Sequence, residues 1–308
     1  MLVPSRGPAA RLARLLDSLE PQSAAHEVIV VDNASPGGEV AALCAGRAGV
    51  EVIGLDRNAG FSAAMNLAAG RAGGDVLVLL NDDCRCDPEF VERIVAALDP
   101  AAGVTMAAGV LRDAARPGVI DTAGLQLDRT LLASDYLNGR PLDALVGGVP
   151  DPLGPSGAAA AFDREAFLAV GGFDENLFAY WEDTDLALRL IRDGSRCRLA
   201  PDARGDHEHS ATLGAGSAEK NRLTGFGRGY VLRKWGVITP RRAVPVLARE
   251  AALLAGQAVA DRNLAGLSGR IAGWRAADPT EEYPELPAAG DAESLPRLLR
   301  SRWARRSG

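Results

Sequence analysis

The sequence predicts an α/β fold with a mostly parallel, Rossmann-like sheet flanked by helices, followed by a helical C-terminal region. Short apolar runs alternate with helical segments through the first 110 residues, and beyond Ser217 the pattern is helical and rich in arginine. Alternation of this kind is typical of a parallel sheet covered by helices on both faces. The chain has 308 residues, 47% of them hydrophobic, which is enough for a sizeable core.

Three apolar runs read as buried parallel strands: Val28–Val31, which ends at Asp32, then Val50–Leu55, then Asp75–Leu80, which ends at Asn81. The expected helices are Pro8–Glu20, Glu39–Arg47, Phe61–Arg71 and one that starts at Asp87-Pro88-Glu89, with Asp87 as its N-cap. Ligands of such sheets bind at the carboxyl ends of the strands. We therefore expect Asp32 and the run Asn81-Asp82-Asp83 to face one crevice.

The rest of the chain divides by composition. Residues 109–157 are rich in Gly, Pro and Asp and predict loops with short strands, followed by helices at Asp163–Val170 and Asp183–Asp193. Prolines among acidic residues predict a flexible linker over residues 276–296. The expected division is a catalytic domain, 1–217, with halves 1–110 and 111–217, a helical region, 218–275, and a linker with a basic tail, 276–308.

The charge distribution bears on partners. The net charge of −6 argues against a nucleic-acid binder, because a phosphate backbone requires a basic surface. Residues 218–308 hold 16 Lys and Arg against 9 Asp and Glu, about +7, which leaves about −13 for the remainder. The basic part, including the tail Leu295–Arg306, either meets an anionic membrane surface or is a solvated helical face and a frayed terminus.

Features of secreted or membrane-spanning proteins are not evident in the sequence. The cysteines lack zinc-site spacing and are too few for a disulfide scaffold; they are Cys44, Cys84, Cys86 and Cys197. The start, Met1–Pro4, does not resemble a signal peptide. The apolar stretch Ala243–Ala260 is interrupted by polar residues, so we expect no membrane span. A cytoplasmic protein with reduced thiols, peripheral to the membrane at most, fits best.

Asp82 and Asp83 are adjacent carboxylates directly after a buried strand. Two such groups repel each other and lose hydration unless a cation lies beside them. A hard divalent ion bound by oxygens and by substrate phosphates would supply that cation. The alternative is an ordinary strand-end turn, where Asn and Asp are common.

A second acidic pair, Glu182-Asp183, follows the aromatic run Phe178-Ala179-Tyr180-Trp181. A carboxylate beside apolar rings can have a raised pKa and serve as a general base. The alternative is an acidic first turn at a helix N-terminus.

His207 and His209 flank Glu208, and imidazole is a frequent metal ligand. The alternative is a pair of turn histidines. Gly-rich phosphate loops and a G-x-S-x-G elbow do not occur, which removes the commonest competing functions of an α/β chain.

Together and in this order, the motifs resemble those of the family 2 glycosyltransferases, in particular the bacterial rhamnosyltransferase-like branch. The resemblance covers roughly residues 1–235. It is carried by V-P-S-R-G at 3–7, V-D-N-A-S at 31–35, R-N-A-G-F-S-A-A-M-N at 57–66, L-L-N-D-D at 79–83, G-G-F-D-E at 171–175, W-E-D-T-D-L at 181–186 and H-E-H-S at 207–210.

The resemblance implies a GT-A fold and a role for each matching residue. The expected donor contacts are Pro4, Asp32, Asn33, Arg57, Asn66, Asn81 and Asp82. Asp83 would bind a divalent cation, Mg²⁺ or Mn²⁺, with His207 as a further metal or diphosphate contact and His209 as a weaker candidate. Asp183 would be the catalytic base, supported by Glu182. Asn81 replaces the first acid of the family's metal motif.

The implied reaction is an inverting, metal-assisted transfer of a sugar to an acceptor hydroxyl in cell-envelope glycan synthesis. The donor would be dTDP-rhamnose or a UDP-sugar, and the acceptor a lipid-linked glycan, a polysaccharide or a small metabolite. Only Met1 and Leu2 precede Val3, so either the first strand is short or the true start lies upstream. A short strand would favour a non-catalytic nucleotide-sugar-binding protein; a sugar-phosphate nucleotidyltransferase would need a basic Gly-rich loop that Ser5-Arg6-Gly7 does not supply.

Overall fold

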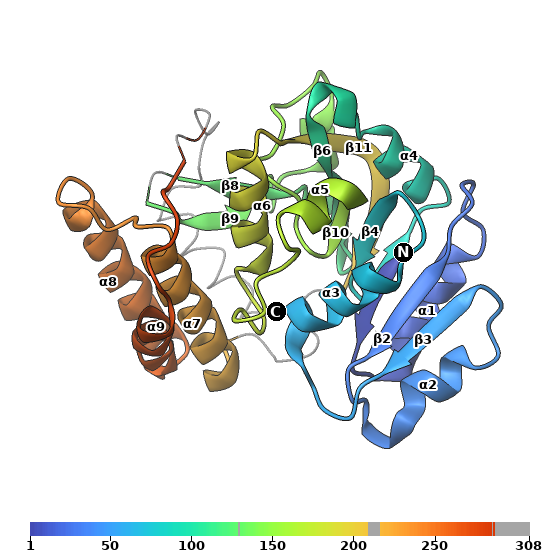
Figure 1. Ribbon diagram of the computed structural model, residues 1–308, viewed down its shortest axis with the longest axis horizontal. Coiled ribbons are helices and arrows are strands. Elements are labelled where there is room, and N and C mark those ends of the chain that lie inside the picture. The colour runs from blue at the N-terminus through green and yellow to red at the C-terminus, as the bar shows by residue number, and fades with distance from the viewer. Residues whose placement is uncertain (129, 209–215, 285, 287–308) are drawn as a thin grey trace.

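The computed structural model describes residues 1–128, 130–208, 216–284 and 286 (Figure 1). The strands are β1 (Leu2–Ser5), β2 (Val28–Asp32), β3 (Val50–Gly54), β4 (Val76–Leu80), β5 (Cys84–Cys86), β6 (Val104–Asp113), β7 (Arg116–Thr122), β8 (Leu125–Leu127), β9 (Ala133–Asp135), β10 (Ala159–Asp163) and β11 (Arg196–His207). The α-helices are α1 (Ala9–Leu19), α2 (Glu39–Cys44), α3 (Gly60–Arg71), α4 (Phe90–Ala96), α5 (Arg164–Ala169), α6 (Glu182–Arg192), α7 (Ala218–Lys234), α8 (Ala243–Ala260) and α9 (Ala265–Ala276). Three short 3₁₀ helices lie at Pro36–Gly38, Pro100–Ala102 and Leu142–Leu145.

The first half of the main sheet is parallel, as expected, in the order β3-β2-β1-β4. Every residue of β2 is buried, because alternate side chains enter two different cores. Ile29 and Val31 pack into the core under α3, whereas Val28 and Val30 pack into the core under α1. β1 is short but fully integrated, since its four residues pair with Ile29–Asp32.

Beyond β4 the sheet becomes mixed. β10 runs antiparallel to both β4 and β6, and β11 runs parallel to β6. β5 pairs antiparallel with β11, and β7 pairs antiparallel with β6. The region expected to hold only loops and short strands therefore contributes the second half of β6, a ten-residue strand. β11 extends for twelve residues and ends at His207, beside the turn that follows β4.

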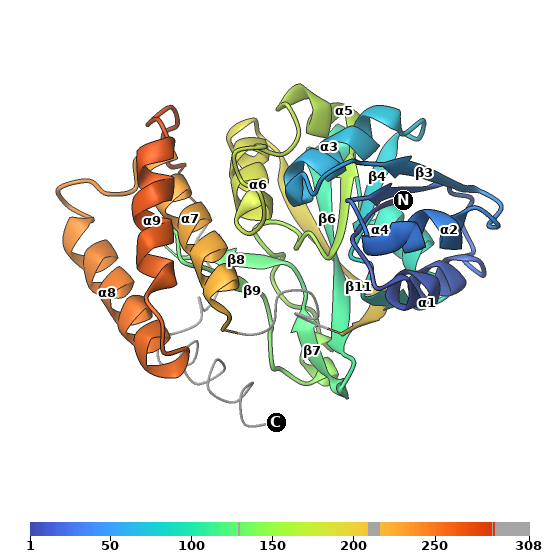
Figure 2. The ribbon, with the colours of Figure 1, turned by 90° about the horizontal axis from the view of Figure 1, so that it is seen from below.

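The helical C-terminal region expected from the sequence is present as α7, α8 and α9. Figures 1 and 2 both place it at one end of the molecule, with α6 between it and the main sheet. α7 and α9 pack with their backbones nearly touching: a Cβ added at Gly273 would lie 1.9 Å from the Phe226 carbonyl oxygen. A third core, formed around Trp235, joins this region to α6 and β8.

Two local expectations are wrong. The helix expected to start at Asp87-Pro88 begins at Phe90, because the Asp87 carboxylate does not cap it but accepts a hydrogen bond from Arg112 Nη2 at 2.7 Å. The first residues of the expected linker, 276–296, pack against the rest of the protein. Ala277 is buried, the Glu281 amide donates to the Lys234 carbonyl at 3.0 Å, and the Tyr283 hydroxyl donates to the Asp128 carbonyl at 3.1 Å. The basic tail, 295–306, and His209 lie outside the described residues.

Candidate active site

The turn after β4 carries the first acidic cluster. The Cys84 amide donates to the Asn81 carbonyl at 3.2 Å and closes the turn, so that the peptide carrying Asp82 and Asp83 projects beyond the sheet edge. The Ser5 hydroxyl, at the end of β1, donates to Asp82 Oδ2 at 2.6 Å. Burial raises the pKa of Asp82 to about 6, against the opposing effect of that hydrogen bond. Asp82 thus connects the ends of β1 and β4.

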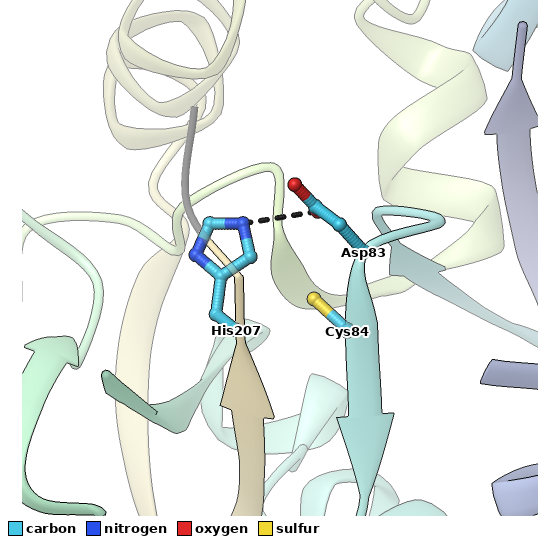
Figure 3. A group of neighbouring side chains, drawn as sticks. All are labelled: Asp83, Cys84 and His207. Carbon is cyan, nitrogen blue, oxygen red and sulfur yellow. Dashed lines mark ion pairs between the residues drawn. The ribbon is translucent and has the colours of Figure 1, made fainter. Parts of the chain in front are cut away.

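Asp83 faces His207 across the sheet edge (Figure 3). His207 Nε2 lies 3.1 Å from Asp83 Oδ1, and His207 Nδ1 lies 2.7 Å from Asp121 Oδ2, on β7. Burial disfavours the imidazolium, but the hydrogen bond to Asp121 and the adjacent carboxylate of Asp83 outweigh it and raise the pKa of His207 to about 10. The same contacts outweigh burial at Asp83 and lower its pKa. The imidazole of His207 therefore lies between two carboxylates that favour its charged form.

This arrangement suits a divalent cation. Asp83 Oδ1 is buried and lacks a hydrogen bond of good geometry despite its proximity to His207. When His207 Nε2 releases its proton, a carboxylate oxygen and an imidazole nitrogen both face one point, while Asp121 holds the other ring nitrogen. A carboxylate that orients a metal-binding histidine is a common arrangement.

Cys84 belongs to the same cluster, because its sulfur lies within 4.8 Å of the ligand atoms of Asp83 and His207. Its thiol is fully buried and donates to the Ala158 carbonyl at 3.5 Å. Burial raises its pKa well above the ordinary value, so the sulfur stays protonated and is a poor ligand for a hard cation. Asp83 and His207 would hold the ion, and donor phosphate oxygens would complete its shell.

The second acidic cluster forms the first turn of α6, where the positive end of the helix dipole favours carboxylates. Asp183 Oδ1 accepts from the Thr184 amide at 2.7 Å, and Oδ2 accepts from the Gly157 amide at 3.4 Å. Burial raises the pKa of Asp183 in spite of these bonds. Burial and the neighbouring charge of Asp183 raise the pKa of Glu182 to about 8, and Glu182 Oε2 has no hydrogen-bond partner.

The backbone just before this pair is left-handed at two successive non-glycine residues, Tyr180 (φ 71°) and Trp181 (φ 80°). Such conformations cost of order 1–3 kcal/mol each and persist only where the surroundings enforce them. Contacts with α7 do so here. Trp181 Nε1 donates to the Thr224 carbonyl at 3.1 Å, and the Arg228 guanidinium lies 5.1 Å from the Trp181 ring centre.

One short loop connects the two acidic clusters. The Gly157 amide donates to Asp183, while the next carbonyl, that of Ala158, accepts from the Asn81 amide at 3.4 Å and from the Cys84 thiol. The clusters are distant in sequence, yet they contact adjacent residues of the same loop. A substrate lying over this loop would contact a cation site on one side and a buried base on the other.

The other expected donor contacts fall into two groups. Pro4, Asp32 and Arg57 lie at or just beyond the carboxyl ends of β1, β2 and β3; Asp32 accepts from the Ser35 amide at 2.8 Å, and Arg57 is exposed. Asn33 and Asn66 have their amides engaged with backbone. Asn33 binds the Ala59 amide and Gly60 carbonyl, and Asn66 binds both backbone polar atoms of Phe173. Their side chains hold loops beside the site.

Two further acids support the site and were missed by sequence reasoning. Asp121 lies in the stretch read as loops, and only the pairing of β6 with β7 brings it to His207. Asp185 is fully buried and binds the Lys234 ammonium, the Trp235 indole and Arg189. The third acid of W-E-D-T-D-L was a visible signal for this anchor, because Asp185 lies three positions after Glu182 and directly before the apolar run Leu186–Leu188.

A parallel half-sheet with a mixed extension and acidic clusters at its carboxyl edge is the architecture of a GT-A-type glycosyltransferase. Two solved structures share this fold. GalNAc-T7, solved with UDP, GalNAc and Mn²⁺, has a TM-score of 0.62 at 16% identity, over 82% of this chain and 50% of that one. The mannosyltransferase PcManGT from Pyrobaculum calidifontis, solved with GDP-Man and Mn²⁺, has a TM-score of 0.54 at 20% identity, over 100% of this chain and 79% of that one.

The chain belongs to the family 2 glycosyltransferases. Residues 76–237, more than half of it, match the family described as glycosyl transferase family group 2, and residues 1–117 match glycosyl transferase family 2. It is 28% identical over 229 residues to the O-antigen biosynthesis protein RfbC of Myxococcus xanthus, covering 69% of this chain and 17% of that protein. It is 28% identical over 185 residues to the uncharacterized glycosyltransferase YwdF of Bacillus subtilis, covering 59% of this chain and 63% of that one. The chain thus spans less than two thirds of these relatives.

Proposed function

We propose that this glycosyltransferase moves a sugar from a nucleotide-sugar donor to an acceptor hydroxyl with inversion at the anomeric carbon, assisted by a divalent cation. The observation that carries the proposal is the shared loop at Gly157-Ala158, which contacts Asp183 through the Gly157 amide and Cys84, the neighbour of Asp83, through the Ala158 carbonyl. Attack by the acceptor from the Asp183 side and departure of the diphosphate on the Asp83 side would place the two groups on opposite faces of the sugar.

Asp183 is the proposed general base. Its surroundings raise its affinity for a proton by desolvation, and hydrogen bonds from Gly157 and Thr184 fix its orientation. It would accept the proton of the acceptor hydroxyl as that oxygen attacks the sugar. Glu182, beside it, would stay protonated near neutral pH and donate a hydrogen bond to the acceptor, because its pKa is raised to about 8.

Asp83 and His207 are the proposed cation ligands, with Asp121 orienting the imidazole. A bound divalent ion would neutralise the charge that develops on the leaving diphosphate. Asp32, Arg57 and Asp82 are the proposed donor contacts, together with Pro4 and Asn81, while Asn33 and Asn66 would act by holding the neighbouring loops.

The donor and acceptor are proposed from resemblance. The branch resemblance favours dTDP-rhamnose, and the UDP and GDP-Man bound in the fold neighbours keep UDP- and GDP-sugars in consideration. The O-antigen relative from Myxococcus supports a role in cell-envelope glycan synthesis, which would take place at the cytoplasmic side of the membrane. A lipid-linked glycan is the acceptor class that we favour.

Asp183→Asn tests the proposal. General-base catalysis typically contributes about 10²–10⁴-fold, so kcat should fall by that range while donor binding measured by calorimetry is retained. The matched control is Asp193→Asn at the exposed other end of α6, which should transfer normally. Near-normal turnover in Asp183→Asn would remove the assignment of the base.

A further inference from the structure

The outer face of α8 is apolar along its whole length, an inversion of the usual amphipathic pattern. The polar side chains Glu250 and Gln257 point into the protein, at 8% and 3% exposure. The opposite face is formed by aliphatic side chains, among which Val244, Leu247 and Val259 are 78%, 55% and 70% exposed. A surface helix of a water-soluble domain normally has the reverse arrangement.

The outward orientation of this face is fixed by buried charge pairs. Glu250 Oε1 accepts from Arg228 Nε of α7 at 2.7 Å, and Glu250 Oε2 accepts from Arg270 Nε of α9 at 2.6 Å. Val246, on the same side of α8, enters the core around Trp235. Rotating α8 to hide its aliphatic face would expose Val246 and leave two buried guanidinium groups without their carboxylate, which is strongly unfavourable.

α9 adds a second apolar stripe. Leu264, Leu267, Ile271 and Trp274 recur at intervals of three and four residues and are all exposed, with Leu264 at 60%. The opposite side of α9 is the glycine face packed on α7. Figures 1 and 2 place α8 at the outer edge of the molecule, beyond α7 and α9 as seen from the sheet. We call the outer residues of α8 and this stripe of α9 the apolar face.

Exposed arginines lie at the ends of the two helices. Arg241 precedes α8, Arg262 lies in the turn between α8 and α9, and Arg275 lies in the last turn of α9. A helix layer with an aliphatic surface and arginines at its helix ends is suited to the interface of an anionic bilayer, where acyl chains contact the apolar side chains and lipid phosphates bind the arginines. A second copy docked on the same face about a two-fold axis would bring like charges together.

We propose that the apolar face docks the enzyme on an anionic membrane surface, with α8 lying in the interface. By length and composition α8 is also the one helix among the described residues that is long and apolar enough to cross a membrane. Its 18 residues span roughly 27 Å, slightly less than the hydrocarbon core, and its Glu250 is committed to α7 and α9. An α8 that lies on the bilayer buries its aliphatic face among the acyl chains and keeps the contacts of Glu250 with α7 and α9.

The docked orientation would place the active site close to the membrane. α7 lies against α8 through Arg228–Glu250, and the same Arg228 covers Trp181, which directly precedes the acidic pair. A lipid-linked acceptor would reach Asp183 within the thickness of this helix layer. This last point rests on the proposed transfer reaction, whereas the docking itself does not.

Flotation of the full chain with vesicles tests the docking. We expect it to float with phosphatidylcholine vesicles that contain phosphatidylglycerol, and poorly with phosphatidylcholine alone. Leu247→Asp with Val259→Asp should lower partitioning by roughly tenfold or more, because apolar area is lost and charge is added. The matched control is Val146→Asp, an 82% exposed aliphatic residue on the catalytic domain, which should float like the wild type.

Circular dichroism of the same samples shows whether the variants are folded. Sugar transfer to a soluble acceptor shows whether they are active, so a loss of membrane binding can be distinguished from a loss of fold or of catalysis. Lost flotation with retained fold and transfer supports the proposal. Unchanged flotation of the double variant assigns membrane binding to another part of the chain and overturns it. A wild type that does not float but forms a dimer, dissociated by the double variant, identifies a self-association surface and also overturns it. Absent transfer in every sample counts against the proposed function alone.

Discussion

At the scale of single residues, the proposed cation site would depend on Asp121, a side chain that binds the histidine rather than the ion. Asp121 binds His207 Nδ1 at 2.7 Å and thereby directs Nε2 toward Asp83. The imidazole could otherwise rotate or exchange its tautomers. Partners of this kind typically contribute 10–100-fold in metal affinity.

Asp121→Asn should therefore raise the Mn²⁺ concentration needed for half-maximal activity by about 10–100-fold, with a smaller effect on kcat at saturating Mn²⁺. Measuring activity over a range of Mn²⁺ concentrations gives both the half-maximal Mn²⁺ concentration and kcat at saturation. The control is Asp113→Asn, which removes a surface ion pair with Arg116 in the same hairpin and should leave the titration unchanged. An equal loss of kcat at all Mn²⁺ concentrations would contradict the positioning role.

Asp183 and Glu182 titrate as a coupled pair. Asp183 must be deprotonated to act, and burial raises its pKa, so activity should rise with pH along a limb displaced upward from the ordinary aspartate range. Glu182, with a pKa raised to about 8, carries no charge while Asp183 titrates, so Glu182→Gln should leave this limb in place. A pH–rate profile of both proteins measures the position of the limb. A limb that moves to lower pH in Glu182→Gln would show that Glu182 is charged over this range.

At the scale of elements, the sequence predicted well the strands that are buried on both faces of the sheet and the segments recognised by a short continuous motif. β2 and β4 are apolar runs between helices, and the parallel direction in which each lies beside β1 follows from that pattern. β10 and β11 were not predicted, because one is a run of alanines and the other is largely polar, and only their neighbours make them strands. Asn66 binds Phe173 across 107 positions, a contact that no local pattern contains.

The glycines between α7 and α9 provide the test at this scale. A Cβ at Gly273 would lie 1.9 Å from backbone, so Gly273→Ala must push the helices apart and should lower the melting temperature by several degrees, a cost of about 1–3 kcal/mol or more. Gly70→Ala in α3 is the control, since nothing lies within 4 Å there and the change favours helix by up to about 1 kcal/mol. Equal melting temperatures for Gly273→Ala and the wild type would contradict this packing.

At the scale of the whole molecule, the helical region contacts the helix that carries the proposed catalytic base. Asp185 on α6 binds Lys234 and Trp235 at the end of α7, and Arg228 of α7 covers Trp181. The helical region therefore supports the acidic pair directly. The division into a catalytic domain, 1–217, and a separate helical region, 218–275, stays a prediction, and these contacts indicate that the two would not function apart.

Ligand-dependent stability of the whole chain should identify the donor. A nucleotide sugar present at 100 times its Kd stabilises the folded state by about 2.7 kcal/mol, a rise of several degrees in melting temperature. We expect the largest rise with the true donor and Mn²⁺ or Mg²⁺ together, and its loss in EDTA. The panel would compare dTDP-rhamnose with UDP- and GDP-sugars. Full transfer activity in EDTA would exclude the proposed cation.

The left-handed pair Tyr180-Trp181 limits how far this catalytic motif can be transplanted. A peptide with the sequence of residues 178–186 would relax to ordinary backbone angles, because the contacts that enforce the turn come from Thr224 and Arg228. Grafting the motif onto another helix would reproduce its sequence but not the orientation of the Asp183 side chain. A designer who wants this base in a new scaffold has to carry α7 along with it.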